Sequence, residues 1–488
     1  MALTLSALPL LLAGCTVGPN YEPPATEMPQ TWVGAMEGGL VAEPVDLGVW
    51  WTSFKDPTLD GLVERALEAN LDLREARARV LEARAQRGVV AADDQIQLNA
   101  NSSYTRSRAS ENGVPGGNFG SAGRETDLFQ LGFDASWELD VFGGVRRGVE
   151  AADGDIGAAE EDLGGVRVSL LAEVARNYVE LRGFQERLRI AMNNVGVQAE
   201  TVTLSRARYE AGLSSELDLK RAEAQLATTQ SSIPTFQAGA RASTFRLALL
   251  LGARPDALVD ELSTPKDIPV AVDRAAVGVP ADLLRRRPDI RGAERRLAAA
   301  TARVGVATAD LYPKFTIVGS LGLQASQIGD FVDANSRFYN IGPGVRWAIL
   351  SGGRIRSNIK VQEARVEQAA ARYERAVLTA LQESEEALVN YVREQERLRS
   401  LQEAVVAQRR AVELASELNA RGLTDFFSVL DTQRQLFALE DQSVQSRQAV
   451  SANLISVYKA LAGGWGDPVG PTSAQPAGTP PTVPPPPN

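Results

Sequence analysis

The sequence contains no histidine and only one cysteine among its 488 residues. A single cysteine cannot form an intramolecular disulfide, and one cysteine without any histidine excludes a zinc site of the Cys/His kind. Histidine is also the most common general acid or base, so its absence lowers the expectation of an enzyme. We therefore predict no catalytic residue, no metal site and no bound cofactor.

Positive charge is also scarce, with 51 Lys and Arg against 61 Asp and Glu and a net charge of -10. A nucleic-acid-binding protein usually presents a basic face. One basic run stands out at 285–287, and an isolated run of this kind is typical of a solvated helix start. We predict no nucleic-acid partner.

Residues 1–14 form an apolar run that is too short to span a membrane as a helix and is typical of a secretory signal peptide. The run ends in Leu-Ala-Gly-Cys, which resembles a bacterial lipobox. This resemblance implies cleavage before Cys15 and lipid attachment to its thiol, and Thr16 in the next position favours the outer membrane. No Lys or Arg precedes the apolar run, so the natural start could lie upstream of Met1.

Alternation of apolar and polar residues predicts four strands, near residues 96–104, 129–141, 315–325 and 339–349. Phe129, Phe133 and Trp137 share the apolar face of the second strand, and Trp347 lies on that of the fourth. Such a pattern suits a strand with lipid on one side and water on the other, but a half-buried strand of a soluble sandwich has the same period. The strands alone leave both interpretations open.

Most other segments have the apolar spacing of helices. Residues 59–90 predict one amphipathic helix. The stretch 145–211 predicts a continuous helix of roughly 100 Å, with a break near 164–165 as the alternative. A second helix is expected from Ser215 to about Leu251, because Ser215 suits an N-cap and Gly252 a C-terminal stop.

The helical pattern is duplicated at a spacing of 210 residues. Gly212 and Leu213 interrupt the first copy, and Gly422 and Leu423 interrupt the second. Each half therefore predicts a helix, two strands, a long helix, a Gly-Leu turn and a return helix.

This repeat sets the expected domain boundaries. The signal peptide (1–14) is followed by a lipidated leader and equatorial segment (15–55) and the first repeat (56–252). A linker with equatorial residues (253–280) leads to the second repeat (281–462), and a Pro-rich tail (463–488) has the composition of a disordered segment.

Four membrane-facing strands cannot close a barrel, because open sheet edges are not tolerated in lipid and small single-chain barrels have about eight strands. If the strands span a membrane, several copies must share one barrel. Three copies give twelve strands, whereas two give eight and leave almost no lumen. The expected fold is thus a mixed α+β membrane protein: a shared trimeric twelve-stranded β-barrel continued by a long α-helical barrel.

The chain resembles the TolC-type outer-membrane efflux factors of the lipoprotein branch that partners resistance-nodulation-division pumps. The resemblance is carried by the stretches 12–21, 50–59 and 279–291 and by the two Gly-Leu turns. It implies a homotrimer in the outer membrane that extends into the periplasm and docks to a periplasmic adaptor and an inner-membrane pump. The chain would then be the exit duct for drugs or other small molecules, and not an enzyme.

The same resemblance implies the functional residues. The adaptor-docking turns are Gly212, Leu213, Gly422 and Leu423. At the closed tip of the tunnel, Asp431 forms an acidic ring with an apolar ring at Phe427 one helical turn earlier. Three such acids around one axis would attract cations.

A gating tie is also expected at this tip, between Asp218 on the first turn and a basic residue on the second. Thr424 occupies the position of the family's usual basic partner. Arg421 is the nearest remaining candidate.

Three alternatives remain. One is a type I secretion or metal-efflux conduit of the outer membrane. Another is a periplasmic coiled-coil adaptor lipoprotein, which should lack the four alternating strands. The third is an enzyme with paired carboxylates, such as a glycosidase, although no pair lies in a Gly-rich or aromatic loop.

Overall fold

The computed structural model describes residues 16–33, 39–41, 47–108, 110, 125–270 and 275–465. The signal peptide, Cys15 and most of the tail therefore lie outside the described residues. The chain divides into two compact units, and each draws segments from both halves of the sequence: Met1–Glu27, Asp72–Leu163 and Pro288–Thr379 in unit 1, and Met28–Leu71, Gly164–Arg287 and Ala380–Asn488 in unit 2. The predicted domain boundaries stay a prediction.

The elements follow one another in the predicted order. The first half contains β1 (Leu40–Val41), η2 (Trp50–Phe54), α1 (Pro57–Ala69), α2 (Leu71–Ala91), η3 (Ala92–Asp94), β2 (Gln97–Arg108), β3 (Glu125–Leu139), α3 (Gly144–Glu210) and α4 (Glu216–Leu250). The second half contains β4 (Ala275–Ala276), α5 (Asp282–Arg286), α6 (Pro288–Ala309), β5 (Lys314–Ala325), η4 (Ile328–Asp330), η5 (Ala334–Ser336), β6 (Arg337–Arg346), α7 (Arg354–Ala420) and α8 (Phe426–Ala460).

The helices repeat with the spacing that the sequence predicts. α3 and α7 have 67 residues each, and α4 and α8 have 35 each. Every bound of the second pair lies 210 positions after that of the first: 144 and 354, 210 and 420, 216 and 426, 250 and 460. The internal duplication is therefore confirmed.

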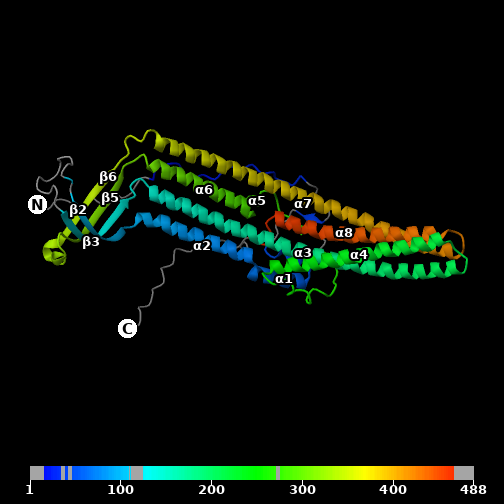
Figure 1. Cartoon of the computed structure of the whole chain (residues 1–488). Helices are drawn as coiled ribbons and strands as arrows, with labels where there is room; N and C mark the ends of the chain where they lie inside the picture. Colours follow the sequence, from blue (N-terminus) through cyan, green and yellow to red (C-terminus); the bar gives the residue numbers. More distant parts are fainter. Residues whose placement is uncertain are drawn as a thin grey trace. The chain divides into compact units, whose positions relative to one another are not determined.

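Unit 1 contains one four-stranded sheet in the order β2-β3-β5-β6, with every pair antiparallel (Figure 1). The register aligns the predicted apolar positions across all four strands; for example, Ala100, Phe133, Leu321 and Tyr339 are successive cross-strand neighbours. The predicted strands and their faces are confirmed as far as Leu139 in the second strand and Val345 in the fourth. The fourth strand ends at Arg346, earlier than predicted, so Trp347 follows it.

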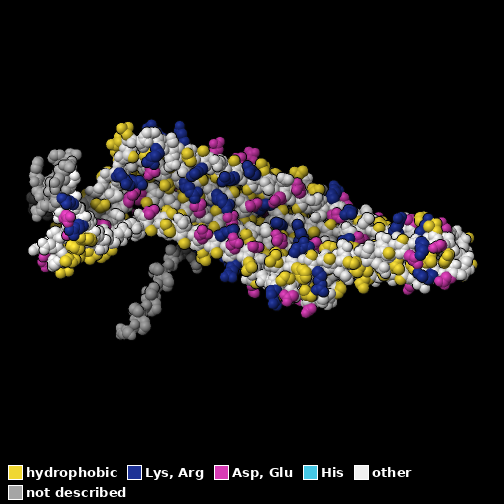
Figure 2. Space-filling view, viewed as in Figure 1, with side chains coloured by type: hydrophobic (Ala, Val, Ile, Leu, Met, Phe, Trp, Pro, Cys, Tyr) yellow, Lys and Arg dark blue, Asp and Glu magenta, His cyan; other side chains and the backbone are white. Residues whose placement is uncertain are grey.

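The apolar face of this sheet is largely exposed to solvent in the single chain. Tyr339 and Ile341 of β6 are 85% and 75% exposed. Figure 2 shows hydrophobic side chains gathered on the surface of the strand region. In an isolated chain this face lacks the cover that a water-soluble sheet normally receives.

The helix predicted over 59–90 is interrupted at Asn70, where α1 ends and α2 begins. Asn70 is buried, and its Nδ2 donates to the carbonyl of Leu250 at 2.8 Å. The Asn70 side chain therefore satisfies a carbonyl in the last turn of α4, and Asn70 itself is the C-cap residue of α1. The interruption was not predicted because its partner lies 180 residues away.

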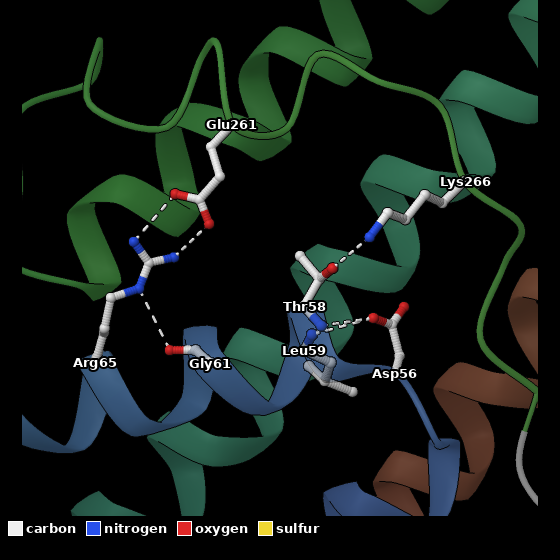
Figure 3. Close-up of polar contacts among 7 residues, drawn as sticks. All are labelled: Asp56, Thr58, Leu59, Gly61, Arg65, Glu261 and Lys266. Atoms are coloured by element: carbon white, nitrogen blue, oxygen red, sulfur yellow. Dashed lines mark hydrogen bonds and ion pairs between the residues drawn. The ribbon is translucent and has the colours of Figure 1, made fainter.

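α1 begins at Pro57, slightly before the predicted start at 59, with Asp56 as N-cap and proline in the first turn. Asp56 Oδ1 accepts from the backbone N–H of Thr58 at 2.8 Å and from that of Leu59 at 3.4 Å (Figure 3). The segment between the halves is tied to the same helix: Lys266 Nζ donates to Thr58 Oγ1 at 2.7 Å. Figure 3 also shows Arg65 bound by both oxygens of Glu261, at 2.7 and 3.1 Å.

No break occurs in α3 at Gly164 and Gly165, so the continuous helix is the correct alternative. Gly164 is required by packing, because a Cβ there would lie 2.4 Å from the ring of Trp465. At Gly183 the nearest atom to an added Cβ is Oε1 of Gln448 of α8, at 2.2 Å, which is the end of a flexible side chain. Close packing therefore explains Gly164, although glycine in a helix costs roughly 0.5–1 kcal/mol relative to alanine.

None of the helices that the structure describes has a stretch long and apolar enough to cross a lipid bilayer.

Candidate functional site

The two Gly-Leu turns in unit 2 have the same backbone geometry. Gly212 and Gly422 both have φ of 73°, a left-handed conformation that L-residues rarely adopt. In each turn the N–H groups of the glycine and of the following leucine donate to carbonyls of the preceding helix, in a Schellman-type arrangement. The bonds are Gly212 N–H to Tyr209 O (2.9 Å), Leu213 N–H to Arg208 O (2.8 Å), Gly422 N–H to Asn419 O (3.0 Å) and Leu423 N–H to Leu418 O (2.9 Å).

Both turns present an apolar side chain to solvent. Leu213 is 75% exposed and Leu423 is 69% exposed. Their positions are those of the predicted docking turns, and docking itself stays a prediction. A surface leucine at the tip of each helical hairpin could bury its side chain only against another molecule.

The return helices begin with side-chain caps of different chemistry. Ser215 caps α4, and its Oγ accepts from the N–H of Asp218 at 3.3 Å. Asp425 caps α8, and its Oδ1 accepts from the N–H and the hydroxyl of Ser428, at 3.0 and 2.5 Å. The hydrogen bonds from Ser428 hold the pKa of Asp425 below its usual value, and the nearby guanidinium of Arg221 contributes to the same shift.

Near the turns, α3, α4 and α8 are packed together by a small apolar cluster. Its members are Val202, Leu219, Ala222 and Leu430, with the partly buried Leu226 and Phe426 against them. Phe426 and not Phe427 thus fills the core at the start of α8. This cluster fixes the direction in which the next residues of α8 point.

Phe427 is about half exposed, and the guanidinium of Arg221 lies over its ring, with Cζ 4.9 Å from the centroid. Arg221 is the position in the first copy that matches Asp431 in the second. The two sequence repeats of one chain are therefore in contact through a cation–π interaction next to the predicted aperture. The assignment of Phe427 to an apolar ring stays a prediction.

Asp431 lies one turn further along α8 and is held by its own helix. Its Oδ1 accepts from Arg434 Nη2 and its Oδ2 from Gln435 Nε2, both at 2.6 Å. Arg434 is far more exposed than Asp431, so this pair lies at the surface of the single chain. The negative charge at the predicted aperture is thus partly balanced by an arginine of the same chain.

The Asp218 carboxylate accepts from Ser215 Oγ at 2.8 Å. Among the described residues, no ion pair joins Asp218 to Arg421. The local partner is preferred because Ser215 caps the same helix turn. The role of Asp218 and Arg421 in a gate stays a prediction.

A different polar contact connects the two turns. Arg208 Nη1, in the last turn of α3, donates to Asn419 Oδ1 at 3.1 Å, and Asn419 Nδ2 donates to the carbonyl of Thr424 at 3.1 Å. Sequence reasoning did not single out this pair. The sequence did contain a hint. The two repeats differ at the matching positions Tyr209 and Asn419, just before glycine turns that have the same geometry.

The predicted aromatic residues of the sheet occupy two kinds of position. Phe129 stacks on Tyr104 of β2, with centroids 4.8 Å apart, and Phe133 is 47% exposed on the apolar face. Trp137 and Trp347 instead make equivalent contacts 210 positions apart. Trp137 Nε1 donates to Asp94 O and Trp347 Nε1 to Leu311 O, both at 2.9 Å, so each hairpin is closed at its base by one tryptophan.

Cys15 lies outside the described residues, but the leader directly after it is held by a buried arginine. Arg147 Nε donates to Val17 O at 3.2 Å, and its Nη2 donates to Gly18 O at 3.4 Å and Asn20 Oδ1 at 2.6 Å. A buried guanidinium with several acceptors is a strong anchor. Sequence reasoning missed Arg147, which ties the described leader residues to the first turn of α3.

The sequence matches the family described as Outer membrane efflux protein in two stretches, residues 62–253 and 279–463. Together these cover most of the chain and leave out the segment between the two halves.

Individual relatives agree with this match. The chain is 32% identical to nodulation protein T of Rhizobium leguminosarum bv. trifolii over 88% of this chain and 90% of the relative. It is 32% identical to the pyoverdine export outer membrane protein OpmQ of Pseudomonas aeruginosa over 95% and 97%. The solved outer-membrane channel OprN is similar with a TM-score of 0.86 and 39% identity, over 92% of this chain and 99% of OprN. This chain therefore belongs to the outer membrane efflux protein family.

Proposed function

We propose that three copies of this chain form one outer-membrane exit duct, in which a twelve-stranded barrel continues into a helical tunnel. Family membership establishes an efflux channel of the outer membrane and not an enzyme. The trimer, the shared barrel and the lipid anchor at Cys15 are the proposal.

One observation carries the shared barrel: the sheet has two open edges and an exposed apolar face. β2 and β6 each pair with only one neighbour in the four-stranded sheet. An edge strand leaves a row of N–H and C=O groups without ladder partners, which lipid does not tolerate. Pairing of β6 with β2 of the next copy satisfies both edges at once.

The number of copies follows from the lumen. Two copies would give eight strands, whose interior is filled by side chains, whereas three give twelve and leave a channel. The polar face of the sheet then lines the water-filled interior. One row across it consists of Asn99, Asp134, Ser320 and Asn340, which are direct cross-strand neighbours.

The partners follow from the two turns. The exposed Leu213 and Leu423 mark the surface expected to meet a periplasmic adaptor, which links the duct to an inner-membrane resistance-nodulation-division pump. The pump supplies the energy and selects the drugs or other small molecules that leave through the duct. The chain itself needs no cofactor beyond the lipid.

Disulfide trapping between edges tests the shared barrel. In a Cys15→Ser background, Ser103→Cys on β2 is combined in turn with Phe338→Cys, Asn340→Cys or Gly342→Cys on β6. We expect at least one combination to give dimers and trimers, and nothing larger, on a non-reducing gel of outer membranes. Monomers throughout the series would contradict the shared barrel, and ladders beyond three would contradict the trimer.

A matched control uses the sheet's interior. Gln130 and Gln324 are direct partners in the β3–β5 ladder. The double variant Gln130→Cys and Gln324→Cys should therefore cross-link within one chain and migrate as a monomer.

A further inference from the structure

A cavity of about 510 Å³ lies in unit 2 between α3, α7 and α8. Part of its lining is aliphatic, and this part comes from all three helices: Ile190, Val197, Val405, Val412, Leu436 and Val444. A cavity of this volume is within the size range of small-molecule sites.

The charges in its wall are paired with one another. Arg409 Nη2 lies 2.9 Å from Glu440 Oε1, and Arg447 Nη1 lies 3.0 Å from Glu186 Oε1. Arg189 Nη2 lies 3.7 Å from the same oxygen of Glu186. Three arginines against two glutamates leave a net charge of one positive unit around the cavity.

Four buried polar atoms of residues in the same wall have no hydrogen-bond partner among the described residues. They are Nε2 and Oε1 of Gln198, Oε1 of Gln433 and Oε2 of Glu186. Gln198 is only 3% exposed, and all three side chains line the cavity. Buried polar atoms are nearly always paired in folded proteins, so a bound molecule that pairs with these atoms would gain several hydrogen bonds from one wall.

The chemistry of these atoms limits what that partner can be. Three are acceptors and one is a donor. An anion such as a carboxylate offers acceptors, so it would satisfy only Gln198 Nε2. A cation would satisfy the acceptors but would meet the net positive charge of the wall.

A neutral primary carboxamide fits this set best. Its two N–H groups donate to Gln198 Oε1 and to one of the two oxygens of Gln433 and Glu186, and its carbonyl accepts from Gln198 Nε2, as in a paired amide dimer. An aliphatic body would cover the valine and leucine side chains. We propose that this cavity is a binding site for small neutral molecules that carry a primary carboxamide on an aliphatic body.

The proposal is tested on the full-length protein in detergent with hexanamide as the probe. Saturation-transfer NMR compares it with hexanoate, hexylammonium and hexan-1-ol, which share the alkyl chain and differ in the polar group. We expect hexanamide to bind and the other three to bind at least several-fold more weakly. Equal signals from hexanamide and hexan-1-ol would mean partition into detergent only and would overturn the proposal.

The variant Gln198→Leu locates the site. Loss of two hydrogen bonds should weaken hexanamide binding about tenfold or more. Its thermal midpoint should not fall, because the substitution removes an unsatisfied amide. The control Gln442→Leu changes an exposed glutamine of α8 outside the cavity and should bind hexanamide as the native chain does.

A second variant, Gln433→Leu, keeps the test decisive if Gln198→Leu does not fold. It removes one acceptor and leaves Gln198 in place, so binding should weaken by a smaller factor. Unchanged hexanamide binding in either folded variant would show that the cavity is not the site. None of these measurements depends on conductance or on the trimeric barrel, so the proposal stands or fails separately from the proposed function.

Discussion

The guanidinium of Arg221 lies over the ring of Phe427, with Cζ 4.9 Å from the ring centroid. The contact joins α4 of the first repeat to α8 of the second at the predicted aperture. A cation–π contact at an exposed site contributes about 0.5–1 kcal/mol. It therefore restrains an aromatic side chain that solvent would otherwise leave free.

Arg221→Ala should loosen the start of α8. We expect amide hydrogen exchange in residues 426–430 to become about two- to five-fold faster, in keeping with the size of a cation–π contact. Lys220→Ala is the matched control, since Lys220 has the same charge but pairs with Glu223 at 2.9 Å. Equal acceleration in both variants would show that net charge, and not the ring contact, stabilises this segment.

The same chemical change should have opposite effects at two glycines. Gly422 has φ of 73° and Gly196 lies inside α3. Apart from the local backbone, no atom of the described residues lies within 4 Å of a Cβ added at either position. Gly422→Ala should therefore destabilise the fold by about 1–2 kcal/mol through backbone strain alone. Gly196→Ala should stabilise it by about 0.5–1 kcal/mol, because alanine favours a helix.

Urea unfolding of the two variants, followed by circular dichroism, measures both effects. A loss of stability at Gly196 would mean that its side of α3 is covered by another chain. An unchanged midpoint for Gly422→Ala would mean that the turn tolerates another backbone conformation.

The Asp425 cap should make the start of α8 sensitive to acid. The pKa of this carboxyl is lowered in the fold from an ordinary value of 3.8, first of all by the hydrogen bonds from Ser428. A group with a depressed pKa stabilises the fold above its unfolded pKa, and the contribution is lost as pH falls through the folded pKa. Protection of the Ser428 amide should therefore be constant from pH 7 to about 5 and decline below about 4.

Hydrogen exchange, corrected for its intrinsic pH dependence, measures this decline. Asp425→Asn is the control, because asparagine caps a helix without titrating. Its protection should stay flat over the same range. A parallel decline in that variant would assign the acid sensitivity to another carboxyl.

Local sequence patterns predicted the strands, the faces of the sheet and both turns, because each depends on residues close together in the chain. The strand face of Phe129 and Phe133 follows from a period of two, and the turns at Gly212 and Gly422 follow from a repeat. The interruption at Asn70 could not be found in this way, since its side chain binds a carbonyl of α4. Arg147 and the Arg208–Asn419 contact escaped prediction for the same reason.

The basic run 285–287 shows the limit most clearly. Local reasoning predicts a solvated helix start, and Arg285 is indeed exposed. Arg287 is buried, and it donates to the carbonyl of Ala460 at 3.0 Å and to Glu383 Oε2 at 2.7 Å. Its role depends on the C-terminus of α8, which no local pattern indicates.

Removing Arg287 should thus cost far more than removing its neighbour. Arg287→Ala leaves a buried carbonyl at the end of α8 and a carboxylate without this partner, so we expect a loss of about 2–3 kcal/mol. Arg285→Ala at an exposed position should change stability by about 0.5 kcal/mol or less. Thermal unfolding of both variants under one set of conditions gives the comparison, and equal losses would contradict the structural role of Arg287.

The intrahelical partner of Asp431 predicts how conductance responds to substitution. Arg434 lies 2.6 Å from the carboxylate. If Asp431 lines the aperture, as we propose, a passing ion meets the field of a partly balanced pair. Asp431→Asn should reduce the preference for cations in planar-bilayer recordings. Arg434→Gln should raise that preference, because less positive charge then compensates the carboxylate.

Glu413→Gln is a control for a surface carboxylate paired in the same way, with Arg410. If Asp431→Asn and Glu413→Gln shift the reversal potential equally, Asp431 is not at the aperture. If only Arg434→Gln has no effect, the ion pair is too weak to matter in the assembled channel, and the ring of Asp431 alone sets the selectivity.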